Sequence, residues 1–226
     1  MAGLGNAMLE AEACWLRRAL DGFEGERLSP LLNLGCGNAA RRKTPQPWME
    51  DQLFRPLRMR GVEIVHVDMR PGPEVDVQAD VTDAADAARL RSLRPRALLC
   101  CNLLEHVVEP ERLAHHCLAM LAAGGLVFVT VPFSYPYHGD PIDTMYRPSP
   151  SDLAALFAGA RLIEGAVVGT GRSYFDDLRQ RPWLLLRHAA RLPIPFLSFE
   201  KWRRSMAKLY RLNAEYRISC AVFERI

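Results

Sequence analysis

The sequence predicts an α/β fold with a mostly parallel sheet, and three observations support it. Short apolar runs typical of buried strands recur along the chain. Stretches of helical composition separate most of them, and this alternation places helices on both faces of a parallel sheet. A Gly-x-Gly turn, Gly35 and Gly37, directly follows the first run. We therefore expect a doubly wound, Rossmann-like sheet of seven strands.

The elements follow from these patterns in order. An amphipathic helix is predicted within residues 1–25, because Leu9, Trp15, Leu16, Leu20 and Phe23 recur at near-helical spacing. The predicted strands are residues 31–35, 62–68, 75–79, 97–101, 126–131, 160–168 and 218–223. Three further helices are predicted at residues 48–60, 84–93 and 110–121. A late helical lid, residues 174–215, would be inserted between the last two strands of a single domain, residues 1–226.

Composition narrows the class of protein. A chain of 226 residues suits one domain with a sizeable core, and 29 basic against 26 acidic residues give no global signal for nucleic acid, which we do not expect as a partner. The six cysteines lack CxxC or paired Cys/His spacing, so we predict buried thiols and no metal site. No apolar stretch approaches the length of a membrane span and no leader pattern is visible, which favours a cytoplasmic protein.

The first glycine turn and the second strand carry the clearest binding signal. Glycines at Gly35 and Gly37 let ligand atoms lie against the backbone, although a glycine pair is also an ordinary turn. Asp68 ends the run "VEIVHVD", where a carboxylate can accept hydrogen bonds from both ribose hydroxyls. The dinucleotide fingerprint fits poorly, since "NAA" follows Gly37 in place of a third glycine. Asp68 also stands 31 positions beyond Gly37, against about 20 in that fingerprint.

Three segments in this order match another family. "LNLGCGN", "VHVDMRPGPEVDVQADVTD" and "LLCCNLLEHVVEPERLAHHCLAMLAAGGLVFVTVP" resemble the motifs of class I S-adenosylmethionine-dependent methyltransferases over about residues 30–160. The likeness is greatest to small bacterial methyltransferase-domain proteins whose first motif reads NLGCG. The resemblance implies S-adenosylmethionine as the cofactor.

It also implies a set of cofactor contacts. Asp68 would hold the ribose hydroxyls, and Asn33, where many family members carry an acidic residue, would lie near the cofactor's amino group. Gly35, Cys36 and Gly37 would lie against the methionine and ribose part. The other implied contacts are with the adenine, through Met69, Asp80 and Val81, and with the methionine portion near the sulfonium, through Cys101 and Asn102.

Methyl transfer is a direct displacement, so the protein mainly aligns the reactants and excludes water. An alcohol or phenol acceptor would also benefit from a general base. Glu105 and His106 follow the fourth strand, and this Glu-His pair recurs in the resembled family, where the histidine can line the acceptor side. The alternative is that Glu105 anchors a helix and His106 is packed.

A second set of titratable groups follows the fifth strand in "PFSYPYHGDPIDTMYRPSPSDLAALF". The pattern formed by His138, Pro141, Asp143 and Arg147 resembles a His-, Pro-, Asp- and Arg-bearing segment of the same subgroup. His138 is a candidate base that Asp143 could orient, and Arg147 could hold an anionic group of the acceptor. An internal lattice of ion pairs among the three is an equal alternative.

The late insertion is basic and aromatic. Residues 178–217 contain ten Lys or Arg against two Glu, with tryptophans, phenylalanines and leucines among them. Such a segment can lie on an anionic membrane surface or cover a phosphorylated substrate, for example a glycan intermediate. The alternative is a helical lid that packs on the domain or on a second subunit of a homodimer.

These patterns lead to one interpretation and two rivals. We expect S-adenosylmethionine-dependent methyl transfer, on oxygen, to a small-molecule or glycan-intermediate acceptor. The rivals are a nicotinamide-dependent oxidoreductase and a non-catalytic scaffold of methyltransferase fold that binds a partner or a membrane through the insertion.

Overall fold

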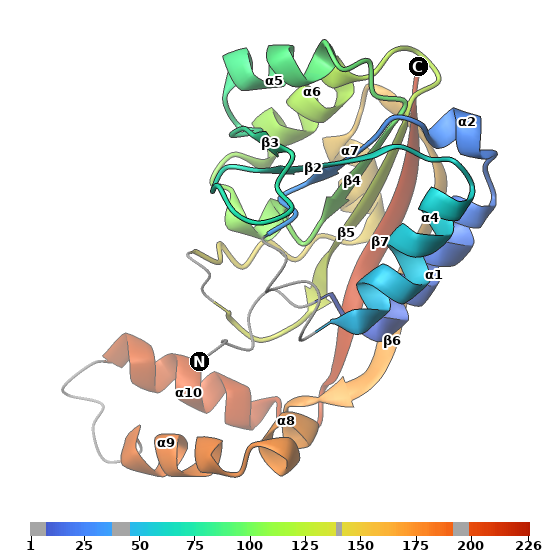
Figure 1. Ribbon diagram of the computed structural model, residues 1–226. Coiled ribbons are helices and arrows are strands. Elements are labelled where there is room, and N and C mark those ends of the chain that lie inside the picture. Colours follow the sequence, from blue (N-terminus) through green and yellow to red (C-terminus); the bar gives the residue numbers. More distant parts are fainter. Residues whose placement is uncertain (1–7, 38–45, 139–141, 192–198) are drawn as a thin grey trace.

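A seven-stranded sheet forms the centre of the computed structural model, which describes residues 8–37, 46–138, 142–191 and 199–226. The strand order is β3-β2-β1-β4-β5-β7-β6 (Figure 1). β7 runs antiparallel to both of its neighbours, and the other neighbouring strands are parallel. The strands are β1 (Leu31–Leu34), β2 (Ile64–Asp68), β3 (Val77–Gln78), β4 (Ala97–Cys101), β5 (Leu126–Ser134), β6 (Ala160–Ser173) and β7 (Glu215–Arg225). The predicted α/β fold with a mostly parallel sheet is confirmed.

Helices cover both faces of this sheet. On one face, α1 (Glu10–Asp21), the π-helical η1 (Met49–Phe54) and α4 (Arg55–Met59) pack on the strands through a core that includes Leu16, Leu53 and Phe128. On the other face, α5 (Ala84–Arg91), α6 (Pro110–Met120) and α7 (Pro150–Leu156) share a second core. Alternate residues of β1 and β4 supply the two cores, as expected of strands buried on both sides.

The topology fixes where a ligand can bind. From β1 the chain proceeds to β2 and β3 on one side, and then returns to β4 on the other side. In doubly wound sheets the crevice for a ligand lies at this reversal, outside the carboxyl ends of the strands. The turn after β1, the end of β2 and the short 3₁₀ helix η2 (Leu104–His106) after β4 all lie at that edge.

Several element boundaries differ from the prediction. The N-terminal helix spans Glu10–Asp21, and a separate short helix, α2 (Gly25–Leu28), follows Gly22. β3 has two residues instead of the predicted five, because it is an edge strand that pairs with β2 alone. β5, β6 and β7 extend beyond their apolar runs, because the antiparallel pairing with β7 continues past the core.

Three helices, here called the lid helices, lie between β6 and β7: α8 (Tyr174–Gln180), α9 (Trp183–Arg191) and α10 (Phe199–Tyr210). They project from one end of the sheet (Figure 1). His188 of α9 joins them, because its ring lies within hydrogen-bond distance of the Tyr174 hydroxyl at 2.6 Å and of the Ser205 hydroxyl at 2.5 Å. None of the described helices is long and apolar enough to cross a membrane.

Candidate active site

A cavity of about 490 Å³ opens at the predicted edge of the sheet. This volume is in the range of sites for small molecules and cofactors. Eight of the residues singled out in the sequence line it together: Gly35, Gly37, Asp68, Met69, Asp80, Val81, Asn102 and His106. The fold therefore brings residues from the ends of β1, β2 and β4 to one wall, although 71 positions separate Gly35 from His106 in the sequence.

The turn after β1 requires its glycines. Gly35 and Gly37 have φ angles of 64° and 62°, in the left-handed region that side chains disfavour. A Cβ atom on Gly35 would also lie 2.9 Å from Cδ1 of Leu103, another residue of the cavity wall. The turn thus presents bare backbone to the cavity.

Asp68 joins this turn to the end of β2. Its Oδ2 accepts a hydrogen bond from the backbone N–H of Gly37 at 2.8 Å, and its Oδ1 accepts one from the backbone N–H of Arg70 at 2.9 Å. Both oxygens belong to a residue of the cavity wall. The carboxylate is therefore held in a fixed orientation on the cavity wall.

The residues implied for the adenine lie further along the same wall. Met69 is 59% exposed, which leaves its side chain available to pack on a ring. Asp80 stabilises its own turn, because its Oδ1 accepts hydrogen bonds from the backbone N–H and the hydroxyl of Thr82 at 2.9 and 2.7 Å. Val81 is buried beside it.

Three residues for which the resemblance implies a cofactor contact, Asn33, Cys36 and Cys101, are not among the residues that line this cavity. Asn33 is buried, and its side-chain amide lies 3.1 Å from Nδ1 of His66 on β2. Cys36 turns its thiol to the Gly37 carbonyl oxygen at 3.0 Å. Cys101 packs with the core under α1. For these side chains the implied contact with the methionine portion stays a proposal.

Sequence reasoning missed Glu12, which supports the cavity wall from α1. Glu12 is fully buried, and its Oε1 accepts hydrogen bonds from Nδ2 of Asn102 at 2.8 Å and from the Thr130 hydroxyl at 2.5 Å. Burial raises the pKa of Glu12 to about 7, despite these hydrogen bonds and one from the Leu9 N–H. Asn102 is thereby fixed in a left-handed conformation, at a φ of 49°, on the cavity wall.

Glu105, His106 and His138 form a cluster, of which His106 lines the cavity. Glu105 is fully buried, and neither of its carboxyl oxygens accepts a hydrogen bond from another described residue. Its Oε1 lies 3.7 Å from Nε2 of His106 and 3.8 Å from Nε2 of His138. The two rings meet edge to face with their centroids 5.3 Å apart. Burial raises the pKa of Glu105 to about 8.

The other ring nitrogens of the two histidines are engaged. Nδ1 of His106 is hydrogen-bonded to the carbonyl oxygen of Ile142. Nδ1 of His138 lies 3.2 Å from Oδ2 of Asp143. An Nδ1 that donates to an oxygen carries the proton, so Nε2 is the nitrogen that can accept one in each ring.

Asp143 and Arg147 form the ion-pair lattice that was one of the two predicted alternatives. Nη2 of Arg147 lies 2.7 Å from Oδ2 of Asp143, and the same oxygen accepts a hydrogen bond from the His138 N–H at 2.9 Å. Burial alone would raise the pKa of Asp143, but the hydrogen bonds from His138 and Arg147 outweigh it and hold the pKa below its ordinary value. Arg147 is therefore committed to Asp143. Pro141 of the same motif lies outside the described residues.

The cluster has a second chemical capacity. Glu105, His106 and His138 each offer one ligand atom, and these atoms lie within 4.8 Å of one another. Two imidazoles and a carboxylate are a common ligand set for divalent metals. The sequence predicts no metal, because ligand spacing is not visible when one histidine follows 32 positions after the other. The fold alone brings the three together.

A second, smaller cavity of about 260 Å³ lies between the end of β5, the lid helix α10 and β7. Asp143 is part of its wall and also contacts His138. The cavity therefore adjoins the histidine cluster through Asp143.

The curated proteins that are similar to this chain include O-methyltransferases. No protein-family model matches the chain. The ubiquinone biosynthesis O-methyltransferase of Xanthomonas campestris pv. campestris is 24% identical over 204 residues, which cover 85% of this chain and 75% of that protein. That of Alkalilimnicola ehrlichii is 29% identical over 141 residues, which cover 54% of this chain and 49% of that protein.

Solved structures share the architecture. A putative sarcosine dimethylglycine methyltransferase from Galdieria sulphuraria superposes with a TM-score of 0.54 at 13% identity, covering 95% of this chain and 83% of that one. A SAM-dependent methyltransferase from Anabaena variabilis gives a TM-score of 0.54 at 14% identity, covering 99% and 89%. The chain has the class I methyltransferase fold. A coclaurine N-methyltransferase bound to N-methylheliamine and SAH gives a TM-score of 0.52 at 18% identity, covering 92% and 70%.

The fold and the curated relatives confirm the predicted family of S-adenosylmethionine-dependent methyltransferases, with S-adenosylmethionine as the family's cofactor.

Proposed function

We propose that this methyltransferase transfers a methyl group from S-adenosylmethionine to an oxygen atom of a small-molecule or glycan-intermediate acceptor. The observation that carries the proposal is the position of His106. Its ring lines the same cavity as Gly35, Gly37 and Asp68, so a proton acceptor stands on the wall of the candidate cofactor site. An oxygen acceptor is the kind that gains most from such a base.

The residues around the cavity fit the cofactor. The bare backbone of Gly35 and Gly37 supports close approach of its methionine and ribose part, and Asp68 suits its ribose hydroxyls. Asn102, held by Glu12, would border the methionine portion. The cofactor, when bound, supplies an electrophilic methyl group on a sulfonium. The chain itself orients it and excludes water.

His106 would take the proton of the acceptor hydroxyl at Nε2. Its Nδ1 is hydrogen-bonded to the Ile142 carbonyl oxygen, which fixes the ring and the tautomer. Oε1 of Glu105 lies 3.7 Å from that same Nε2 and, when Glu105 is ionised, would stabilise the imidazolium that forms. Glu105 is fully buried, so we assign it this supporting role instead of a direct contact with the acceptor.

His138, Asp143 and Arg147 would act behind His106 as positioning residues. His138 is 8% exposed and packs edge to face on His106. Asp143 holds His138, and Arg147 holds Asp143, so the three form a chain of contacts that ends at the candidate base. This arrangement favours a role for the three residues in positioning His106, and not a role for His138 as a second base.

The two rival functions have less support. Neither the relatives nor the solved structures described above are nicotinamide-dependent oxidoreductases. A scaffold would not need a histidine and a buried carboxyl beside the glycine turn. The lid supports one further part of the proposal, contact with an anionic membrane surface. Trp183, Leu186 and Phe199 are 50%, 73% and 63% exposed there among arginines. A second copy of the chain is the alternative occupant of this surface.

An S-adenosylhomocysteine-release assay tests the proposed activity. The purified chain is incubated with S-adenosylmethionine and a panel of catechols, simple phenols, phosphorylated sugars and primary amines. Release that depends on a hydroxylated acceptor supports the proposal, and release with amines alone would contradict transfer to oxygen. Flotation with anionic and neutral vesicles tests the membrane contact, and equal recovery with both would contradict it.

A further inference from the structure

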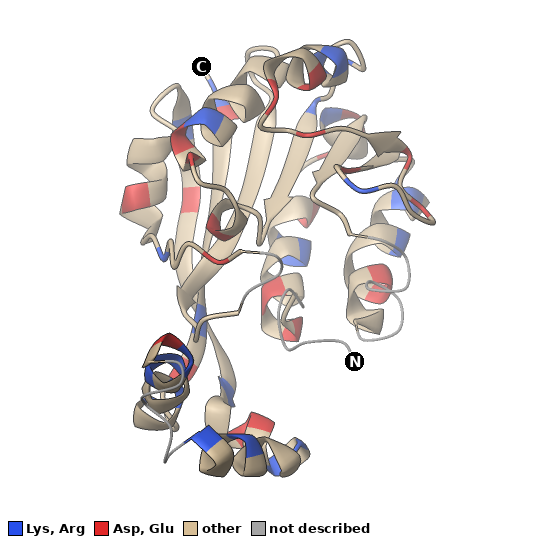
Figure 2. Cartoon of the chain, turned by 90° about the vertical axis from the view of Figure 1, so that its left-hand side faces the viewer, with Lys and Arg blue, Asp and Glu red and all other residues tan. Residues whose placement is uncertain are grey.

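The smaller cavity is built from one face of α10 and an aromatic wall. Glu200, Arg203, Arg204, Ala207, Lys208 and Arg211 line it, at the spacing of residues on one side of a helix. The opposite wall comes from the end of β5, from Tyr174 at the start of α8 and from Tyr216 of β7. Figure 2 shows Lys and Arg along both long lid helices.

The charges that line this cavity do not balance. Glu200 pairs with Arg203 and Arg204, at 3.0 and 2.7 Å. Asp143, the other acidic residue of the wall, is taken by Arg147 at 2.7 Å. Lys208 and Arg211 remain, and neither forms an ion pair with a carboxylate of the described residues. The four cations that line the cavity, Arg203, Arg204, Lys208 and Arg211, thus outnumber its two carboxylates, Glu200 and Asp143, by two.

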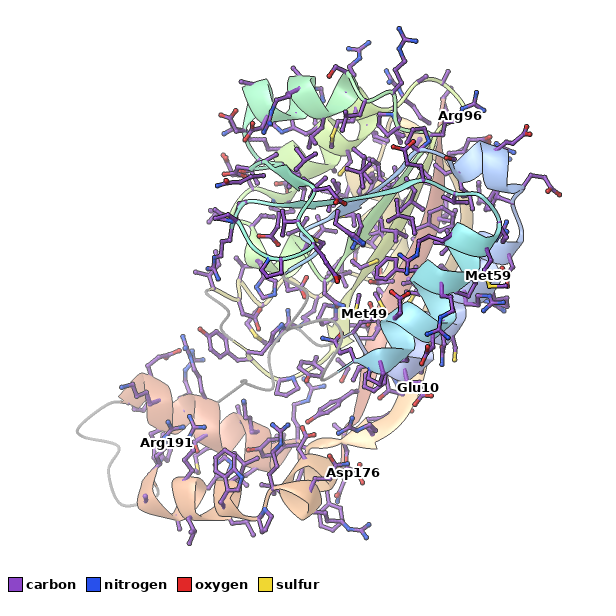
Figure 3. The ribbon with its side chains drawn as sticks, in the orientation of Figure 1. Glu10, Met49, Met59, Arg96, Asp176 and Arg191 are labelled. Atoms are coloured by element: carbon purple, nitrogen blue, oxygen red, sulfur yellow. The ribbon has the colours of Figure 1, made fainter. Side chains whose placement is uncertain are left out.

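The partial burial of Lys208 makes the excess of positive charge in this cavity energetically unfavourable. Its side chain is half-buried, and burial, followed by the nearby Arg187 and Arg191, lowers the pKa of its ammonium, although Asp177 and Asp143 oppose this shift. Figure 3 shows Arg191 at the end of α9, alongside α10. A cation that is partly desolvated among other cations is stabilised by an anion from outside the chain.

Aromatic rings border the same charges. Tyr135, Tyr137, Tyr174 and Tyr216 all line the cavity. Arg204 lies over the Tyr137 ring at 3.7 Å, and the Lys208 ammonium lies 5.7 Å from the centre of the Tyr174 ring. Flat apolar surfaces of this kind pack on sugar or aromatic rings, and cations beside them hold an attached anionic group.

We propose that the cavity between α10 and β5 binds the phosphate ester group of the acceptor, with Lys208 and Arg211 holding the phosphate and the tyrosines holding the attached ring. A doubly charged phosphate matches this excess of two positive charges in a way that a single carboxylate does not. The proposal rests on the proposed methyl transfer, because it names the substrate class for that site. Asp143 connects the two, since it lines this cavity and contacts His138 of the histidine cluster.

Binding of phenyl phosphate, which combines a ring with a phosphate ester, tests the assignment. Isothermal titration is made on the full chain saturated with S-adenosylhomocysteine, with benzoate as the ring that carries a single carboxylate. We expect phenyl phosphate to bind more tightly than benzoate, and Lys208→Gln to weaken it about tenfold or more. Lys208→Arg should retain most of the affinity, because it keeps the charge.

Lys201→Gln is the matched control. Lys201 lies on the exposed side of the same helix, so its substitution removes the same charge without touching the cavity. Unchanged affinity in Lys201→Gln supports the proposal. Equal loss in the two glutamine variants, or equal affinity for benzoate and phenyl phosphate, would overturn it, because general attraction to a basic helix would then explain the binding.

The phosphate group can belong to a soluble ester or to a lipid, and vesicles containing phosphatidic acid distinguish the two. Binding of phenyl phosphate that depends on Lys208 assigns a soluble ester. Vesicle binding that depends on Lys208 but not on Lys201, without binding of phenyl phosphate, assigns a lipid-linked phosphate. Affinity for S-adenosylhomocysteine is measured in the same variants. If the unmodified chain does not bind S-adenosylhomocysteine, the proposed methyl transfer is contradicted. If it binds S-adenosylhomocysteine but neither phenyl phosphate nor the vesicles, only the assignment of a phosphate site is contradicted.

Discussion

The backbone N–H of Gly37 donates a hydrogen bond to Oδ2 of Asp68 at 2.8 Å, and so ties the turn after β1 to the end of β2. The two residues are 31 positions apart in the sequence but share one wall of the larger cavity. A carboxylate already oriented by a backbone amide loses little side-chain freedom when a ligand binds. The candidate cofactor site is therefore organised before the cofactor arrives.

A substitution at Gly35 should damage this site more than a positive φ angle alone would. Gly35→Ala places a Cβ 2.9 Å from Cδ1 of Leu103, so the Leu103 side chain on the cavity wall must move and we expect weaker cofactor binding, with a loss of about 1 kcal/mol in unfolding free energy from the left-handed conformation. Gly61→Ala is the control, because Gly61 also has a positive φ, 76°, but no atom within 4 Å of the added Cβ. It should lose a similar unfolding free energy in urea denaturation and keep the affinity for S-adenosylhomocysteine, and equal affinity in the two variants would contradict the account of the turn.

The sequence predicts the residues of this turn because their signals are local. Gly35 and Gly37 follow an apolar run, and Asp68 ends another one. Parallel strands bring their carboxyl ends to the same edge, so a local pattern becomes a spatial prediction. The strand order and the antiparallel direction of β7 were not predicted, because the alternation of strand and helix indicates only a mostly parallel sheet.

Contacts between distant elements escape such reasoning. Glu12 accepts a hydrogen bond from Asn102, which lies 90 positions away in the sequence, and no local pattern around either residue predicts this contact. The available signal was a carboxyl on the apolar side of the first helix, three positions after Leu9 and four before Leu16. The charge balance of the smaller cavity is likewise hidden, because pairing by Glu200 and Asp143 decides which cations remain.

The buried Glu12 should make stability depend on pH. Its folded-state pKa is about 7 against an ordinary value of 4.5, so the folded chain holds a proton that the unfolded chain releases in this interval. This contribution is present below pH 4.5 and is lost as pH rises through 7, by at most about 3 kcal/mol. Glu12→Gln should remove this part of the decline in urea denaturation and leave the part that comes from Glu105, whose pKa is raised to about 8.

Glu10→Gln provides the comparison for that series. Glu10 lies exposed on the same helix, so its substitution should leave the pH dependence of unfolding unchanged. If Glu12→Gln and the unmodified chain lose stability in parallel between pH 4.5 and pH 7, burial of Glu12 is not the cause.

Replacement of His106 should separate chemistry from binding. In His106→Asn the shorter amide can still donate to the Ile142 carbonyl oxygen, but no proton acceptor remains on the cavity wall. We expect methyl transfer to fall about 10²- to 10⁴-fold, measured with an acceptor identified in the panel, while affinity for S-adenosylhomocysteine changes little. The exposed His115→Asn on α6 should keep full activity. Retention of activity in His106→Asn would exclude His106 as the base.

The central claim, that the cavity at Gly37 and Asp68 binds S-adenosylmethionine, is tested most directly by isothermal titration with S-adenosylhomocysteine, run beside NADH. The unmodified chain should bind S-adenosylhomocysteine in the micromolar range and leave NADH unbound. Asp68→Ala should lose this binding, and Asp51→Ala, at an exposed carboxylate on η1, should retain it. Binding that survives in Asp68→Ala, or a preference for NADH, would contradict the account.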